Sequence, residues 1–214
     1  MLIVFTITVF LAAALLFLLQ PMFARMLLPL LGGSPSVWNT AMMFYQIVLL
    51  AGYAAAHLLV RRLGARGQVW AYLAVALAAV FVLPVAVPRG WLPPTESNPI
   101  PWLLAVLLVA VGLPFFTLAA AGPLLQRWFA ARTAQDPYWL YAASNLGSLL
   151  ALLAYPSLIE PRLGLAQQSR WWSVGFAMLV ALLAITGFWK QQEATATPVS
   201  ATTDEPIPLR RRVR

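Results

Sequence analysis

The sequence predicts an all-α integral membrane protein with six transmembrane helices, and three observations support this fold class. Of the 214 residues, 62% are hydrophobic and 9% are charged, whereas about a quarter of the residues in a soluble domain are charged. Several apolar runs reach the roughly 20 residues that a helix needs to cross a bilayer. Arginine and lysine are also distributed unevenly between alternate loops, as the positive-inside rule describes.

Glycine and proline divide the apolar part of the chain into six predicted spans. They are residues 1–20, 37–60, 69–88, 101–122, 137–158 and 170–190. The first span lacks the basic leader and the cleavage site of a signal peptide, so we expect it to be retained. Ser34 and Pro35 are predicted as the N-cap and the first residue of the second helix. The segment "QPMFARMLLPLLGG" before them is short and interrupted, so we expect it to lie along the membrane interface.

The positively charged residues predict the orientation of these helices. Ten of the fourteen fall on one side of the predicted membrane: Arg61, Arg62, Arg66, Arg127, Arg132, Lys190, Arg210, Arg211, Arg212 and Arg214. The other side has Arg25, Arg89, Arg162 and Arg170. Because cytoplasmic loops are enriched in these residues, we expect a multi-pass protein of the bacterial inner membrane with both termini in the cytoplasm.

The organisation that follows is a membrane domain, residues 1–191, and a basic cytoplasmic tail, residues 192–214. The tail is rich in Thr, Pro and charge, a composition that cannot bury a core, so we expect it to be disordered unless bound. Its four arginines, together with Arg127 and Trp128, are candidates for contact with lipid headgroups or with an acidic partner surface. The nine tryptophans lie near predicted helix ends and form the expected aromatic belt: Trp38, Trp70, Trp91, Trp102, Trp128, Trp139, Trp171, Trp172 and Trp189.

Two polar stripes interrupt the predicted helices. The first, in "YAASNLGSLLALLAYP", consists of Tyr141, Ser144, Asn145 and Ser148. Its spacing of three and four residues places it on one helix face beside the small residue Gly147. The second, on the second helix, consists of Asn39, Gln46, Tyr53 and His57. We expect the second and fifth helices to pack on one another through these stripes and their small residues; the alternative is that the stripes line a cavity for a polar ligand or an ion.

The residue inventory disfavours several kinds of chemistry. With no cysteine and with His57 as the single histidine, the chain offers no disulfide, thiolate nucleophile, Cys-based zinc site or His cluster. We therefore expect no metal, no cofactor and no catalytic residue. Ion-driven transporters usually carry Asp or Glu within a span, and here all six acidic residues fall in predicted loops, helix ends or the tail. The net charge of +8 arises from loops and tail, so we expect no nucleic-acid partner.

Two longer stretches carry a resemblance to a known family. They are "RMLLPLLGGSPSVWNT", from Arg25, and "DPYWLYAASNLGSLLALLAYPSLIEPRLGL", from Asp136. Both resemble the membrane portion of bacterial spermidine-synthase-like membrane proteins, which join transporter-like helices to an aminopropyltransferase domain. The resemblance covers most of residues 8–187 and implies a helical membrane fold. The glycine-rich acidic site of the enzyme half has no counterpart in this sequence, so transferase activity is not expected.

These features predict a non-catalytic accessory or stabilising subunit of a larger inner-membrane complex, of which an energy-converting complex is one example. Its expected partners are membrane lipids and other integral membrane subunits. The alternative hypothesis is a transporter of a small polar solute or lipid. A third hypothesis, an intramembrane lipid-modifying enzyme that uses Arg127, Arg132 and His57, lacks the paired catalytic groups that an active site requires.

Overall fold

The computed structural model describes residues 1–95, 97–133 and 136–189, and every secondary-structure element in these residues is a helix. In chain order, the α-helices are α1 (Leu2–Leu31), α2 (Pro35–Arg62), α3 (Ala65–Val80), α4 (Ile100–Leu107), α5 (Leu113–Thr133), α6 (Tyr138–Ala154), α7 (Glu160–Arg162) and α8 (Leu165–Phe188). Two π-helical turns, η1 (Leu108–Gly112) and η2 (Tyr155–Ile159), join α4 to α5 and α6 to α7. The predicted tail, with Arg210, Arg211, Arg212 and Arg214, lies outside the described residues.

Within the described residues, five continuous helical stretches are long and apolar enough to cross a membrane, which indicates a multi-pass membrane protein. They are Leu2–Leu31, Pro35–Arg62, Ile100–Thr133, Tyr138–Arg162 and Leu165–Phe188. The third predicted span, residues 69–88, corresponds to α3, which is apolar but has only 16 residues. Its predicted extent to residue 88 is wrong, because the helix ends at Val80, shortly before Pro84 and Pro88, which cannot continue the helical hydrogen-bond pattern.

α1 continues through the segment that we expected along the membrane interface, so that expectation is wrong. Pro21 and Pro29 lie inside the helix, where each removes one backbone hydrogen bond. The side chains of Met22, Phe23 and Leu27 are buried in the bundle, and tertiary packing of this kind holds a helix together despite weak local propensity. With 30 residues, α1 is about 45 Å long and exceeds the roughly 30 Å hydrocarbon layer.

The other predicted boundaries are confirmed or extended. Pro35 is the first residue of α2 and Ser34 is its N-cap, as predicted. The Ser34 hydroxyl, however, lies 3.0 Å from the Ser36 hydroxyl and does not bond a backbone amide of the first turn. The fourth predicted span continues to Thr133, and the sixth begins at Leu165 rather than residue 170.

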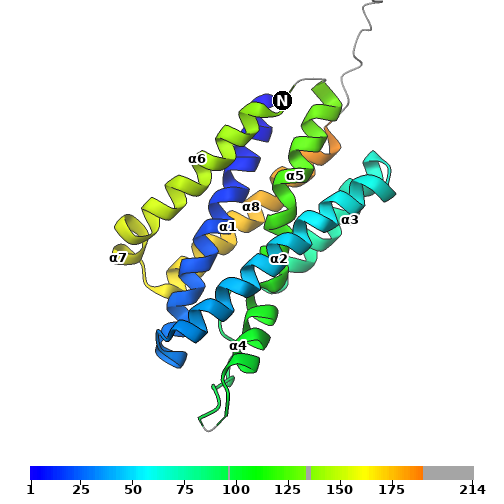
Figure 1. Cartoon of the computed structure of the whole chain (residues 1–214). Helices are drawn as coiled ribbons and strands as arrows, with labels where there is room; N and C mark the ends of the chain where they lie inside the picture. Colours follow the sequence, from blue (N-terminus) through cyan, green and yellow to red (C-terminus); the bar gives the residue numbers. More distant parts are fainter. Residues whose placement is uncertain (96, 134–135, 190–214) are drawn as a thin grey trace, which may run out of the picture.

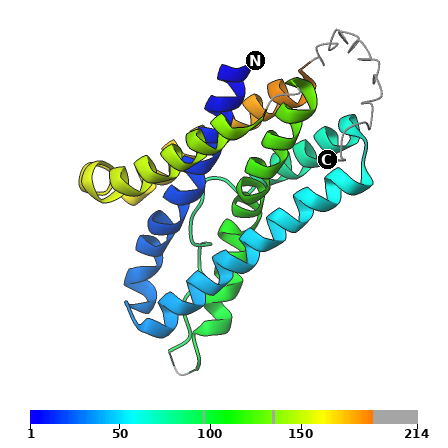
Figure 2. The same cartoon turned by 45° about the horizontal axis from the view of Figure 1, so that its top comes forward.

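α1 and α5 form the centre of the bundle. α1 packs against α5, α6 and α8, and α5 packs against α1, α2 and α3. Figures 1 and 2 show that α6 lies over α1 while α2 runs beside α5 at the other side of the molecule. The predicted packing of span 37–60 on span 137–158 is therefore wrong, because these spans are α2 and α6, and they pack on different central helices. Both helices carry small residues that allow close packing, but the spacing of these residues in the sequence does not determine which helix they pack against.

The core is centred on α1, which packs against both α5 and α8, and it contains several aromatic side chains. The rings of Phe5 and Phe129 form an edge-to-face contact with centroids 5.5 Å apart. Trp172 stacks on Phe176 at 5.4 Å and donates its indole Nε1–H to the backbone oxygen of Leu15 at 2.9 Å. Aromatic pairs in these geometries stabilise a core beyond the area they bury.

Two of the nine tryptophans are interior residues, which corrects the prediction that all form an aromatic belt. Trp128 and Trp172 are only 3% and 4% exposed, and both indole nitrogens donate hydrogen bonds inside the bundle. Each lies near a helix end in the sequence, but its side chain points between helices. The other seven are exposed or partly exposed, as interfacial tryptophans are.

Candidate functional site

The polar stripe of α2 lies on the outer face of the helix. Asn39, Gln46, Tyr53 and His57 are all exposed, and their spacing of seven, seven and four residues aligns them along one narrow line. None of the four side chains has a hydrogen-bond partner among the described residues. Gln46 lies about 16 Å along the helix axis from Pro35, which places its amide well inside the apolar span.

The inner face of α2 is the one that packs. Gly52 is buried, and a Cβ atom there would lie 2.6 Å from the Ala119 Cβ and 3.1 Å from the Phe116 backbone oxygen of α5. Tyr45 on the same helix contacts the ring of Phe115 with centroids 4.9 Å apart. Small residues that permit a close backbone approach were predicted on α2, and the structure places that approach against α5.

α6 repeats this division between an inner and an outer face. Gly147 is buried against α1, where a Cβ atom would lie 2.5 Å from the Phe10 backbone oxygen. Tyr141 and Asn145 are exposed, whereas Ser144 and Ser148 are half-buried. The Ser148 hydroxyl donates to the Asn145 backbone oxygen at 2.9 Å, and the Asn145 side-chain amide has no partner among the described residues.

The structure thus separates the nine residues predicted for packing or for a cavity. Gly147 packs inside the bundle, and the two polar stripes point outward from helices that lie at different sides of the molecule. None of the nine lines the basic cavity described below. The amides of Asn39, Gln46 and Asn145 therefore do not meet one another, and their hydrogen-bonding capacity is directed away from the chain.

A cavity of about 860 Å³ lies at the end of the bundle where α2, α5 and α8 end and α3 begins, here called the basic end. Three arginines line the cavity: Arg66 from α3, and Arg127 and Arg132 from α5. Among the described residues, none of those that line it is Asp or Glu. The sequence placed all three arginines on the predicted cytoplasmic side, but it did not predict that they line one cavity.

The wall of this cavity is held by a chain of hydrogen bonds. The buried Trp128 indole donates its Nε1–H to Gln68 Oε1 at 3.1 Å, and Gln68 Nε2 donates to the Leu63 backbone oxygen at 2.9 Å. Trp128 was predicted to contact lipid or a partner from the surface. The structure places it inside the bundle instead, where it fixes α5 to the turn between α2 and α3.

Arg132 binds the carboxyl end of α8. Its Nη2 donates to the Gly187 oxygen at 2.6 Å, its Nε to the Trp189 oxygen at 3.2 Å, and its Nη1 to the Trp128 oxygen at 3.2 Å. A cation at this position satisfies carbonyls that the helix leaves without partners and interacts favourably with the helix dipole. Arg132 therefore has mainly a structural role. Arg66 and Arg127, in contrast, are exposed and have no hydrogen-bond or ion-pair partner among the described residues.

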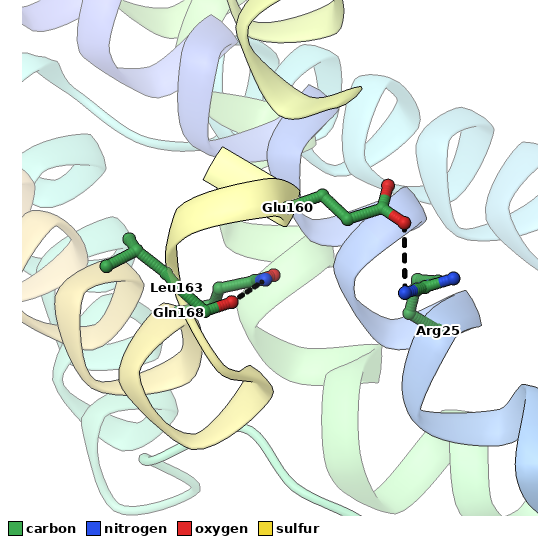
Figure 3. Close-up of polar contacts among 4 residues, drawn as sticks. All are labelled: Arg25, Glu160, Leu163 and Gln168. Atoms are coloured by element: carbon green, nitrogen blue, oxygen red, sulfur yellow. Dashed lines mark hydrogen bonds and ion pairs between the residues drawn. The ribbon is translucent and has the colours of Figure 1, made fainter. Parts of the chain in front are cut away.

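An ion pair marks the other end of the bundle. Arg25 Nη2 on α1 lies 3.0 Å from Glu160 Oε1 on α7, and Figure 3 shows the two side chains reaching toward each other. The pair connects the two stretches that carry the family resemblance, since Arg25 begins one and Glu160 lies in the other. Sequence reasoning missed this pair: it assigned Arg25 to the side opposite the cytoplasm and placed Glu160 only among predicted loops and helix ends.

Next to the pair lie two buried polar atoms without partners among the described residues. Gln168 donates its Nε2 to the Leu163 oxygen at 2.7 Å (Figure 3), but its Oε1 accepts no bond. The Tyr155 hydroxyl, at the start of η2, is also unpaired. Nothing in the sequence spacing distinguishes these two groups from ordinary helix residues.

These groups can take part in recognition by hydrogen bonds and charge. Among the described residues no group of three or more His, Cys, Asp and Glu side chains could hold a metal ion. No known protein family, curated protein or solved structure matches the chain. The resemblance to spermidine-synthase-like membrane proteins and the six-span topology therefore stay predictions.

Proposed function

We propose that this chain is a non-catalytic accessory subunit of a larger inner-membrane complex, and that a transmembrane helix of another subunit covers the outer face of α2. The observation that carries the proposal is the exposed, unpaired Gln46 amide, about 16 Å along α2 from Pro35. Lipid chains offer no hydrogen bonds, and an unsatisfied polar group in hydrocarbon costs several kcal/mol. A polar side chain on a neighbouring helix would remove that cost.

The spacing along this face supports a helical partner. Asn39, Gln46 and Tyr53 are seven residues apart, so they occupy one position of a heptad, the repeat by which two helices stay in contact along a seam. The exposed apolar side chains of Ile47 and Leu50 lie near them on the same helix. Occasional polar residues on such a seam fix the register and the identity of the partner. The Asn145 amide of α6 offers a second contact of the same kind.

Transport of a small polar solute is less well supported by the same residues. A solute path needs polar groups that converge on a shared cavity, and the two stripes face outward from helices that pack on different neighbours. The described spans also contain no acidic residue except Glu160. Glu160 is paired with Arg25 at the end of its helix, so it is not placed to carry a coupling ion through the membrane.

Photo-cross-linking of the full chain in native membranes tests the proposed docking face. A photoreactive amino acid at Gln46 should cross-link to one discrete membrane protein, which should also co-purify stoichiometrically in mild detergent. Position 77 is the matched control, because Leu77 is similarly exposed on α3 but its face carries no polar stripe. The same substitution there should yield no such product.

Three results would overturn the proposal. The first is cross-linking to lipid alone from both positions. The second is a cross-linked dimer of this chain as the only product from Gln46, which would make the face a homodimer contact. The third is recovery of a lone chain that moves a solute across liposome membranes.

A further inference from the structure

We infer that the cavity at the basic end is a binding site for the phosphate headgroup of an anionic phospholipid, with Arg66 and Arg127 as its ligands. The inference is independent of the proposed docking face, because the cavity is lined by other residues. Two guanidinium groups without partners in the described part of the chain border one cavity of about 860 Å³. Guanidinium binds phosphate oxygens through paired hydrogen bonds, and this geometry makes arginine a common phosphate ligand.

The local charge balance favours an anion at this site. Asp136 and Glu160 are the acidic residues within the described ranges, and Glu160 is paired with Arg25 at the other end of the bundle. Neither acidic residue lines the cavity. Arg132 donates hydrogen bonds to the carbonyls at the end of α8. Because these carbonyls already have a cationic partner, they make the cavity less attractive to a second cation. α3 begins at Ala65 on the cavity wall, and the positive end of its dipole adds to the two arginines.

The surroundings favour a lipid over a free anion. Trp70 and Phe188, both lining the cavity, form an edge-to-face pair with centroids 4.9 Å apart, and Trp70 is 63% exposed. Exposed tryptophan at the end of an apolar helix is typical of the headgroup layer. Val60 and Phe188 supply an apolar wall against which the glycerol and first methylene groups of a lipid can pack. Basic cavities between helices on the predicted cytoplasmic side are known lipid-headgroup sites in membrane proteins.

Native mass spectrometry of the full chain in mild detergent tests the site with phosphatidylglycerol as the probe. The native chain should retain bound phosphatidylglycerol in preference to phosphatidylcholine. The double variant Arg66→Gln/Arg127→Gln should bind it about tenfold more weakly or worse, since two charge-assisted contacts are lost. The matched control Arg61→Gln/Arg62→Gln removes the same charge from the same end, but these residues do not line the cavity. Its binding should stay within about twofold of native.

Each alternative gives a different result. Equal binding of both lipids, or unchanged binding by the cavity variant, would overturn the inference. Competition by millimolar inorganic phosphate would show a site for a free anion. If the cavity variant kept its lipid but lost a partner protein, the arginines would instead bind a carboxylate of that partner.

Arg66 and Arg127 are exposed, so the melting temperature of the variant should be native. If it falls, Arg127→Lys serves instead: it keeps the charge but loses the paired hydrogen bonds of guanidinium, so it should weaken phosphatidylglycerol binding by about threefold, and unchanged binding would overturn the inference.

Discussion

The inner and outer faces of α2 and α6 differ in the contacts that their residues make within the chain. On the inner faces, Gly52 and Gly147 allow backbones of neighbouring helices to approach so closely that no side chain fits. On the outer faces, the amides of Gln46 and Asn145 have no partner within the described chain. The small residues on each helix contact another helix of the same chain, and we propose that the polar residues on the opposite face contact another subunit.

The largest expected effect comes from filling the inner face of α6. Gly147→Leu should destabilise the folded chain by about 3 kcal/mol or more, because the new Cβ would meet the Phe10 backbone oxygen, which cannot move aside as a side chain could. Thermal unfolding in detergent and the yield of monodisperse protein measure the loss. Asn145→Ser, two residues away on the outer face, should change stability by less than about 0.5 kcal/mol. Native stability of the Gly147 variant would contradict the close approach of α6 to α1.

The inner face of α2 should respond in the same direction but less strongly. Gly52→Ala should cost about 2 kcal/mol, because its methyl group would lie 2.6 Å from the Ala119 Cβ. Ala119→Gly removes that methyl group, so the double variant should recover part of the loss in a double-mutant cycle. Additive effects of the two substitutions would mean that α2 does not pack on α5 at this position.

A matched pair of glutamine substitutions sharpens the comparison. Gln68 is buried and accepts a hydrogen bond from the Trp128 indole, so Gln68→Leu leaves a buried donor unsatisfied and should cost about 1–3 kcal/mol. The loss should appear in thermal unfolding of the purified chain. An unchanged melting temperature would show that the indole finds another acceptor at little cost.

The smallest effect on the isolated chain is expected from the outer glutamine. Gln46→Leu removes an exposed amide that bonds nothing in the described chain. The unfolding free energy of the purified chain in detergent should stay within about 0.5 kcal/mol of native. A loss as large as that of Gln68→Leu would show that Gln46 is bonded within the chain, and the contrast between the two faces would fail.

Composition and helix signals were enough to predict the helical membrane fold and the start of most helices, but not where most of them end. Ser34 and Pro35 marked the start of α2 because both residue types act through local backbone geometry. Pro21 led to the wrong prediction that the first helix ends near residue 20, because local geometry disfavours proline inside a helix. The helix continues because Met22 and Phe23 are buried against other helices, and the sequence does not show this burial. Tertiary packing of this kind overrides propensity.

The candidate sites could be predicted only in part. The spacing of Asn39, Gln46 and Tyr53 shows that they share one face, but it does not say whether that face points inward or outward. The cavity with Arg66 and Arg127 joins residues 61 positions apart on two helices, so no local pattern contains it. Trp128 lies near a helix end, where both an interfacial and an interior position are compatible with the sequence.

The central claim is that the outer face of α2 binds another subunit, and the most direct measurement is how much partner protein co-purifies with Gln46→Leu. We predict that the variant folds and inserts at the native level. The amount of partner that co-purifies should fall at least about threefold, as expected for the loss of one interhelical hydrogen bond of about 0.6–2 kcal/mol. Leu77→Met on α3, where the side chain is exposed and the face carries no polar stripe, serves as the control for a neutral surface change. Partner recovery that is the same for the native chain and for Gln46→Leu would contradict the claim.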